Sequence, residues 1–257
     1  MVVGQQVLVI GIGAGDPSYV TVQAVAALNR ADVFFVLDKG AAKDDLVALR
    51  KEICDRFIEG DRYRIVERAD PERRLRDGSY QADVQAWHDQ RIDLYESLLR
   101  EEVADGEVAA FLAWGDPSLY DSTTRILDQV AARGTLDLDI EVIPGISSLH
   151  ALTARFAIPL NQIGGAITIT TGRQLVAMDP TDVDNVVVML DGRCSFAEID
   201  PAGLTIYWGA YLGSADEILV TGPLAEVADH IGQVRAEARA RRGWMFDTYL
   251  LRRDPGS

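Results

Sequence analysis

A glycine-rich loop directly follows the first apolar run of the chain, and its Gly-Asp-Pro triplet recurs after a later one. Val7–Gly11 leads into GIGAGDP at residues 11–17, and Val108–Ala113 leads into AWGDPSLY at 113–120. A third loop, PGISS at 144–148, follows Ile140–Ile143. Glycine lets the backbone turn sharply and lets other groups approach it closely. In an open parallel sheet, loops at the carboxyl ends of strands line the ligand site, so we expect an α/β protein with its site at such an edge.

The first half of the chain alternates between strand-like runs and helical patterns, as parallel sheets do. The runs Val7–Gly11, Val33–Leu37, Val108–Ala113 and Ile140–Ile143 are predicted strands. Thr21 is placed to cap the first helix, and residues 42–58 and 80–104 have helical spacing. The arginine-rich segment 62–76 is predicted to be an irregular connection. These patterns predict a domain over residues 1–158 with a mainly parallel sheet.

The second half is richer in strands and contains one clear helix, Leu224–Arg241. A helical pattern that starts at Ser147 is interrupted at Ile158-Pro159, which sets the expected domain boundary there. Residues 159–257 are then a second α/β domain with a mixed sheet, and we expect the ligand cleft between the two domains. The predicted strands of this domain are Ala166–Thr171, Asn185–Leu190, Leu204–Trp208, Glu217–Thr221 and Trp244–Leu251.

Composition excludes several classes of function. The net charge of −15 over 257 residues disfavours nucleic acid as a partner. No apolar run approaches the ~20 residues of a membrane span, and the amino terminus has the pattern of a first strand rather than a leader, so a cytoplasmic enzyme is expected. Cys54 and Cys194 lack CxxC spacing and the three histidines are scattered, so no metal site is predicted.

The first loop favours a cationic ligand over a phosphate. In the dinucleotide-binding motif GxGxxG a third glycine stands where this chain has Asp16, and Pro17 delays the following helix. Carboxylates and carbonyls favour sulfonium and ammonium groups. Asp38, at the end of the second predicted strand, is placed as a ribose-binding acid would be. A nicotinamide-dependent oxidoreductase therefore stays an alternative.

The three loops resemble those of a known family. GxGxGDP at 11–17, WGDPSLYDST at 114–123 and VIPGISS at 142–148 are similar to the tetrapyrrole (corrin and porphyrin) methylases. The resemblance implies S-adenosylmethionine as methyl donor, S-adenosylhomocysteine as product, a tetrapyrrole substrate and a homodimer. Further stretches resemble one member whose reaction methylates a corrin precursor and releases acetate; these are FFVLDKG at 34–40, TTGR at 170–173, VMLDG at 188–192, IYWGAYLG at 206–213 and GWMFDTYLLRR at 243–253.

The same resemblance assigns donor-binding residues to the three loops and to two segments of the second half. Backbone groups are expected to make many of these contacts. The residues are Gly13, Gly15, Pro17, Trp114, Gly115, Asp116, Leu119, Ser147, Ser148, Asp191 and Gly209.

Release of acetate requires a base or a positioned water. Asp116, Tyr120 and Asp121 are the candidates for this catalytic step, whereas His150 is expected to be a structural residue. Substrate carboxylates require cations, and segment 62–76 has six arginines against three acids, although a solvated face is the favoured interpretation of this segment. The predicted substrate-binding residues are Lys39, Arg73, Arg74, Arg125 and Arg173.

Four aromatic residues, Trp208, Tyr211, Trp244 and Tyr249, could stack on a ligand, but core packing is the expected role of such residues on strands. Three alternative functions stay open at this point. They are methylation at another position of a tetrapyrrole, nicotinamide-dependent oxidoreduction, and binding of S-adenosylmethionine without turnover.

Overall fold

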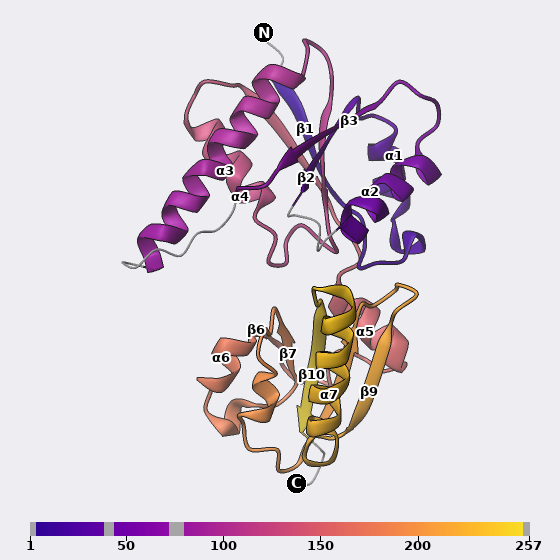
Figure 1. The fold of residues 1–257 in the computed structure, drawn as a ribbon, viewed down its shortest axis with the longest axis vertical. Coiled ribbons are helices and arrows are strands. Elements are labelled where there is room, and N and C mark those ends of the chain that lie inside the picture. Colours follow the sequence, from indigo (N-terminus) through magenta and orange to yellow (C-terminus); the bar gives the residue numbers. More distant parts are fainter. Residues whose placement is uncertain (1–3, 39–43, 72–79, 254–257) are drawn as a thin grey trace. The chain divides into compact units, whose positions relative to one another are not determined.

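A computed structural model describes residues 4–38, 44–71 and 80–253 (Figure 1). The chain divides into two compact units. The first consists of Met1–Gly13 and Pro17–Ile146, and the second of Ala14–Asp16 and Ser147–Ser257. Lys39, Arg73 and Arg74, predicted to bind substrate, lie outside the described residues.

The first unit is built around a parallel five-stranded sheet with the order β3-β2-β4-β1-β5. Thr21 caps the first helix as predicted, because its Oγ1 accepts from the Ala24 N–H at 3.0 Å. The elements are β1 (Gln5–Gly11), the 3-10 turn η1 (Pro17–Tyr19), α1 (Val22–Leu28), β2 (Val33–Asp38), α2 (Asp44–Phe57), β3 (Arg64–Ala69), α3 (Tyr80–Glu102), β4 (Ala109–Ala113), α4 (Thr123–Ala132) and β5 (Leu138–Ile143).

Helices cover both faces of this sheet, which explains why its central strands are apolar without alternation. Val7 and Val9 of β1 belong to the core beneath α3 and α4, whereas Leu8 and Ile10 belong to the core beneath α1 and α2. Figure 1 shows the two pairs of helices on opposite sides of the strands. With both faces of the sheet covered by helices, the site of such a fold is expected at the strand ends.

Strand β3 corrects the expectation that segment 62–76 is irregular throughout. Residues 64–69 pair in parallel with β2 at the edge of the sheet. Of its residues only Val66 is buried. The exposed positions carry charged side chains, so the alternation of apolar and polar residues typical of a strand is weak. Arg64 and Arg68 form ion pairs with Glu107 and Glu102, which makes this part of the segment a solvated, internally paired face.

The second unit contains a mixed five-stranded sheet with the order β6-β7-β10-β8-β9. β6 and β7 are parallel, whereas β10 runs antiparallel to both β7 and β8. The predicted α/β class, with a parallel and a mixed sheet, is thus confirmed. The elements are α5 (Ser148–Phe156), β6 (Thr168–Thr171), α6 (Gly172–Val176), η3 (Pro180–Asp182), β7 (Val186–Met189), η4 (Ser195–Ala197), β8 (Leu204–Ala210), β9 (Ile218–Pro223), α7 (Leu224–Arg242) and β10 (Asp247–Arg253).

Helices α5 and α7 cover opposite faces of the mixed sheet. Successive side chains on a strand point to opposite faces. On β8, Trp208 reaches Asp247, which pairs with Arg235 of α7, whereas a Cβ on the next residue, Gly209, would lie 2.8 Å from Leu152 of α5. Gly209 is therefore a place where a helix packs directly on a strand.

The division between the units falls earlier than the predicted boundary at residues 158 and 159. Helix α5 packs on the mixed sheet and belongs to the second unit, which starts at Ser147. Ala157, in the left-handed conformation, ends the helix just before Ile158-Pro159. The interruption at that proline marks the end of a helix rather than the limit of a domain.

Candidate functional site

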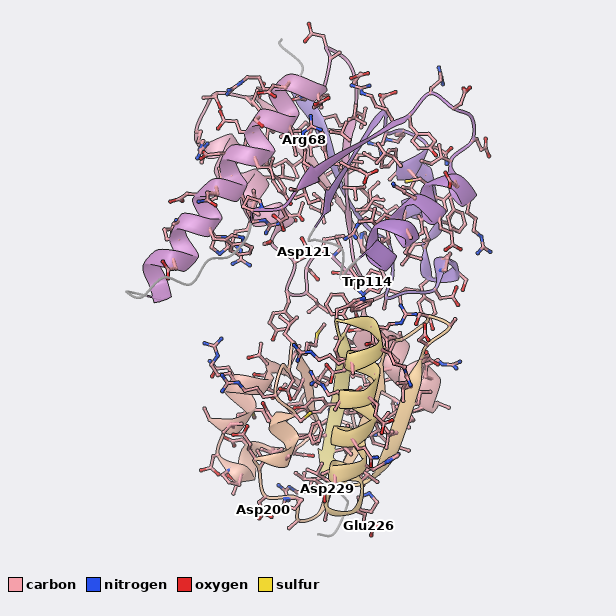
Figure 2. The ribbon with its side chains drawn as sticks, in the orientation of Figure 1. Arg68, Trp114, Asp121, Asp200, Glu226 and Asp229 are labelled. Atoms are coloured by element: carbon pink, nitrogen blue, oxygen red, sulfur yellow. The ribbon has the colours of Figure 1, made fainter. Side chains whose placement is uncertain are left out.

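The three predicted loops follow neighbouring strands of the first sheet. β1 lies between β4 and β5, and all three run in the same direction. After β1 the chain forms β2 and β3 toward one edge of the sheet. It then returns to form β4 and β5, which lie on the two sides of β1. Open α/β sheets bind ligands at such a reversal of strand order, outside the carboxyl ends. Figure 2 labels Trp114 and Asp121, both from the loop after β4, at this end of the sheet.

The first two loops pair through their glycine backbones. The Gly13 N–H donates to the Gly115 carbonyl at 3.2 Å, and the Gly115 N–H donates to the Gly13 carbonyl at 2.8 Å. Both residues have positive φ, +82° and +70°, a conformation that favours glycine. A Cβ on Gly11 would lie 2.6 Å from the backbone nitrogen of Gly145, in the third loop. The glycines therefore permit three backbones to pack together.

Asp116 joins the second loop to the third. Its Oδ2 accepts from the Gly145 N–H at 2.8 Å, and its Oδ1 accepts from the N–H of Ser118 at 2.8 Å and from the Ser118 hydroxyl. Both carboxylate oxygens are thus used within the loops. Asp116 is accordingly placed to hold the loops in position, and its carboxylate is a poor candidate for the predicted base.

The other two catalytic candidates lie next to Asp116 in the same loop. Tyr120 has a left-handed backbone (φ +54°) and an exposed side chain, and partial burial raises the pKa of its hydroxyl. Asp121 uses Oδ1 to accept from the Thr123 N–H at 2.7 Å at the start of α4. A non-glycine residue in the left-handed conformation, such as Tyr120, is strained and occurs where the surrounding structure enforces it.

The serines of the third loop begin the second unit. Ser147 occupies the N-cap position of α5 but makes no capping hydrogen bond; its Oγ instead lies 2.8 Å from Nδ1 of His150. Ser148 Oγ lies 3.0 Å from the Thr248 hydroxyl of β10. Ser147 therefore makes no side-chain cap, and His150, expected to be a structural residue, is exposed and contacts Ser147.

In the second unit Asp191 is buried and fully engaged by its own surroundings. Its two carboxylate oxygens accept from the N–H groups of Arg193 and Ser195 and from the hydroxyls of Ser195 and Tyr249, at 2.6 to 3.0 Å. Burial raises the pKa of the Tyr249 hydroxyl and keeps it a donor. This carboxylate orders the loop after β7, so a ligand contact from residue 191 would come from its backbone.

That loop holds two non-glycine residues, Leu190 and Cys194, in the left-handed conformation. Each such residue costs of order 1 kcal/mol or more. The Asp191 carboxylate, between them in sequence, accepts from the N–H groups of Arg193 and Ser195 in the same loop. Leu190 is 60% exposed despite its apolar side chain. The geometry of the loop depends on groups buried beneath it.

A buried ion pair supports the same region. Arg235 Nε donates to Asp247 Oδ2 at 2.8 Å, with side chains only 9% and 4% exposed, and Arg235 Nη2 donates to the Asp191 carbonyl at 2.7 Å. Trp208 Nε1 also donates to Asp247 Oδ2. Burial raises the pKa of the Asp247 carboxyl, and the Arg235 guanidinium opposes this. With Tyr211, Trp244 and Tyr249 buried as well, the expected core role of the four aromatics is confirmed.

Two of the arginines predicted to bind substrate lie within the described part of the chain. Arg125 on α4 and Arg173 on α6 are exposed, as a carboxylate-binding residue can be. Sequence reasoning missed two less exposed arginines near the carboxyl ends of the first sheet, Arg50 and Arg91. Arg50 Nε donates to the Leu112 carbonyl, and burial lowers the pKa of its guanidinium. Both lie on helical patterns on which nothing distinguishes them from arginines facing solvent.

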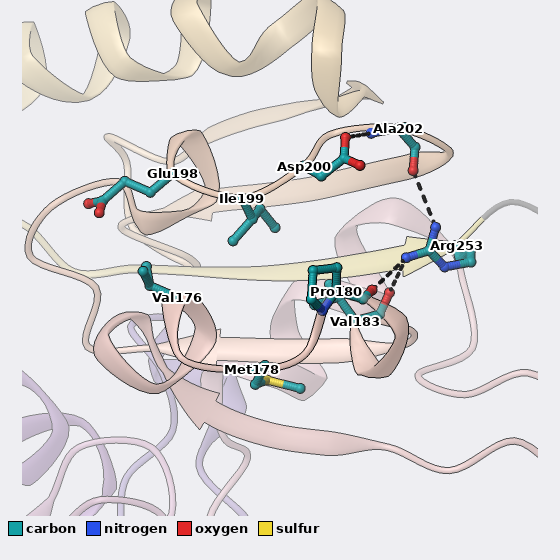
Figure 3. A pocket seen from close by; sticks show the side chains of 9 residues that line it. All are labelled: Val176, Met178, Pro180, Val183, Glu198, Ile199, Asp200, Ala202 and Arg253. Atoms are coloured by element: carbon teal, nitrogen blue, oxygen red, sulfur yellow. Dashed lines mark hydrogen bonds between the residues drawn. The ribbon is translucent and has the colours of Figure 1, made fainter.

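The second unit contains a small cavity of about 150 Å³, which is lined by other residues than those of the predicted site (Figure 3). Arg253 lines it and donates to the carbonyls of Ala202, Pro180 and Val183, which joins loops of the protein to one another. The cavity is smaller than the ~300 to 1,000 Å³ of ordinary ligand pockets. None of its lining residues was predicted to bind a ligand.

Two further properties concern only the residues that the structure describes. None of their helices combines the length and apolar composition needed to cross a bilayer. Nor do they bring three or more His, Cys, Asp or Glu side chains into a group that could hold a metal ion.

Comparison with known proteins gives consistent results. The family model of the Tetrapyrrole (Corrin/Porphyrin) Methylases matches residues 6–228. A precorrin-6A synthase (deacetylating) from Sinorhizobium sp is 49% identical over 249 residues, which cover 97% of this chain and 95% of that protein. A precorrin-2 C(20)-methyltransferase from the same source is 27% identical and covers 72% of each chain.

Solved structures extend the comparison. The crystal structure of a cobalamin synthesis related protein, CobF, from Corynebacterium diphtheriae has a TM-score of 0.85 and 38% identity, covering 98% of this chain and 99% of that one. A uroporphyrin-III C-methyltransferase from Thermus thermophilus, complexed with S-adenosylhomocysteine, has a TM-score of 0.57 at 18% identity, covering 96% and 92% of the two chains. The latter shows a common fold.

Proposed function

Since this chain belongs to the tetrapyrrole (corrin/porphyrin) methylase family, we propose that it is the S-adenosylmethionine-dependent methyltransferase that converts precorrin-5 into precorrin-6A with release of acetate. The observation that carries this proposal is the 49% identity to a deacetylating precorrin-6A synthase, which extends over both units. The loops at the switch point of the first sheet supply a matching site. Family membership removes the support for a nicotinamide-dependent oxidoreductase.

The three loops suit a cationic methyl donor. They contain Asp16 and Asp116, and neither lysine nor arginine occurs in residues 11–17, 113–120 or 144–148. Such a local field favours sulfonium and ammonium groups. We propose that the donor contacts backbone and side-chain groups of the predicted residues, which are Gly13, Gly15, Pro17, Trp114, Gly115, Leu119, Ser147, Ser148, Asp191 and Gly209, with Asp116 holding the loops that bind it.

When bound, S-adenosylmethionine supplies a methyl group that the sulfonium charge already activates. The chain then has to bind both reactants and align them, which requires no strong acid or base. Release of acetate needs more: water adds its hydroxyl to the acyl carbon, and the carbon–carbon bond to the macrocycle breaks with its electron pair left on the macrocycle. Acetate leaves, and the two protons of the water pass to solvent. We propose that Tyr120 and Asp121 position this water.

Binding of the polycarboxylate substrate is proposed to use Arg125 and Arg173, whose exposed guanidinium groups can bind carboxylates in a bidentate manner. Lys39, Arg73 and Arg74 stay predictions from the sequence alone. A homodimer and a location in the cytoplasm also stay predictions, the former open to analytical ultracentrifugation.

The proposed function is tested by incubating the protein with precorrin-5 and methyl-labelled S-adenosylmethionine. We expect one labelled methyl group in the corrin product and one free acetate for each turnover, measured by mass spectrometry and an acetate assay. Methylation without acetate would assign the chain to another methylation step of the family. Binding of S-adenosylhomocysteine without any turnover would indicate a non-catalytic module.

Asp116→Asn is expected to weaken binding of S-adenosylhomocysteine by roughly ten- to a hundredfold, measured by calorimetry. The amide can accept through one oxygen only, so either the Gly145 or the Ser118 N–H loses its acceptor, and a hydrogen bond to a charged group contributes about 1.5–3 kcal/mol. Asp128→Asn, an exposed change on α4, is the matched control. Equal affinities for the two variants would contradict the role given to Asp116.

A further inference from the structure

Strands β2 and β4 separate toward their carboxyl ends. They pair with each other only from Val33 to Phe35 and from Ala109 to Phe111. Beyond these residues β2 continues beside β3 as far as Asp38, and β4 continues beside β1 as far as Ala113. Within these described strands, the last residues of β2 and β4 are therefore not paired with each other, at the end of the sheet where the site is expected.

Arg50 of helix α2 reaches into this gap. The Ala113 carbonyl accepts from the Ile12 N–H, on the side of β1. Successive carbonyls of a strand point to its two opposite edges, so the Leu112 carbonyl faces β2, which has already diverged. Arg50 Nε donates to this carbonyl at 3.2 Å. The guanidinium thus takes the place of a backbone N–H of the neighbouring strand.

A cation is more than this carbonyl requires. Any neutral donor satisfies a carbonyl, whereas removing a charge from water is costly. Burial lowers the pKa of the Arg50 guanidinium, and the attraction of the Asp121 carboxylate does not outweigh this effect. In Arg30, Arg64 and Arg133, by contrast, a hydrogen bond to a glutamate raises the guanidinium pKa. The charge of Arg50 is therefore only partly offset by its surroundings.

Arg91, on α3 near the same end of the sheet, is in a different situation. Its Nε donates to Asp70 Oδ1 at 2.9 Å, and the side chains of this ion pair are only 5% and 4% exposed. Its Nη1 donates to Ser122 Oγ at 2.6 Å. The charge of Arg91 is matched by a carboxylate buried with it, so Arg50 is the stronger candidate for binding an anion that arrives from outside.

We propose that Arg50 is a substrate-binding residue, which receives a carboxylate of the polycarboxylate substrate at the carboxyl end of β4. The inference rests on the proposed function. The hydrogen bond to Leu112 orients the guanidinium before the substrate arrives, and such preorganisation favours binding. Attraction between charges is also stronger at a partly buried site than in water. A carboxylate bound there lies near Asp121, one of the two residues proposed to position water.

The test compares Arg50→Gln with Arg50→Lys, because both keep an N–H donor for the Leu112 carbonyl and only the lysine keeps the charge. We expect the KM for precorrin-5 to rise roughly ten- to a hundredfold in Arg50→Gln, as for loss of a hydrogen bond between charged groups, and clearly less in Arg50→Lys. The kcat should stay within about twofold, because an interaction made equally in the ground state and the transition state affects KM alone. Acetate release and methyl transfer should stay equal in every variant.

Lys51→Gln is the matched control, since it removes one positive charge from the next residue of α2, which pairs with Glu67 at the surface. Its KM should equal that of the unmodified protein. Calorimetry should give the same affinity for S-adenosylhomocysteine in all of these proteins.

An unchanged KM in Arg50→Gln would contradict the proposal, even if urea unfolding showed a loss of stability, because Arg50 would then serve only the Leu112 carbonyl. An equal rise of KM in Arg50→Gln and Arg50→Lys would contradict it as well. Weaker binding of S-adenosylhomocysteine with an unchanged KM would assign the guanidinium to the carboxylate of the donor instead. If the unmodified protein does not convert precorrin-5, the proposed function itself fails, so the two failures are distinguishable.

Discussion

Replacement of Gly145 with alanine is expected to abolish methyl transfer and to lower the free energy of unfolding by about 3 kcal/mol, the upper range for overpacking a well-packed site. A Cβ at this position would lie 2.1 Å from the Gly115 carbonyl oxygen and 2.9 Å from backbone atoms of Gly11. These are backbone atoms of the other two loops and cannot rotate away. The three loops would have to separate, and the site they form would lose its geometry.

The measurements are urea unfolding and calorimetric titration with S-adenosylhomocysteine. Gly232→Ala in α7 is the control, because nothing lies within 4 Å of its added Cβ. Alanine favours a helix over glycine by about 1 kcal/mol, so this variant should be as stable as the unmodified protein or slightly more. Unchanged affinity in Gly145→Ala would show that the packed loops do not form the donor site.

Arg235→Met is expected to destabilise the second unit by about 3–5 kcal/mol, the cost of removing one partner of a buried ion pair. Asp247 would be left buried, with only the Trp208 N–H as a described donor to its Oδ2. The Asp191 carbonyl would lose its hydrogen bond to Arg235 as well. Because this carbonyl belongs to the loop after β7, donor binding should weaken together with stability.

The stability lost in Arg235→Met should become smaller as the pH is lowered. Burial already raises the pKa of Asp247, and loss of the guanidinium raises it further. The folded variant then binds a proton that the unfolded chain, with an ordinary carboxyl pKa near 4, releases, so its stability falls as the pH rises above about 4. Urea unfolding at several pH values would detect this slope.

Arg155→Met removes an ion pair with Glu217 in which the arginine is half exposed, and is expected to cost at most about 1 kcal/mol. Arg235→Met with Asp247→Leu should recover part of the stability, because no unpaired charge is then buried. If Arg235→Met alone cost no more stability than Arg155→Met, the importance given to the buried pair would be contradicted.

The local sequence pattern was sufficient to predict most of the helices and strands. Strands β1, β2, β4 and β5 are apolar because helices cover both faces, and Thr21 marks the start of α1 by its chemistry. Strand β3 was not predicted because an edge strand buries few side chains. Its arginines resemble those of a solvated loop in the sequence, and only the structure shows that they pair with Glu107 and Glu102. The boundary after Ile146 depends on where α5 packs, which periodicity does not reveal.

Residue types and their spacing along the chain were enough to predict the two-sheet α/β class, the three strand-end loops and the resemblance to a methylase family. The roles of individual carboxylates and cations became clear from the folded structure. Asp116 and Asp191 were predicted to serve catalysis or a ligand, yet both are occupied by backbone and hydroxyl donors of their own surroundings. Neither Arg91 nor Arg235 was predicted to be buried. Whether a charged side chain faces water or lies buried against a partner depends on residues that are distant in the chain and are brought together by folding.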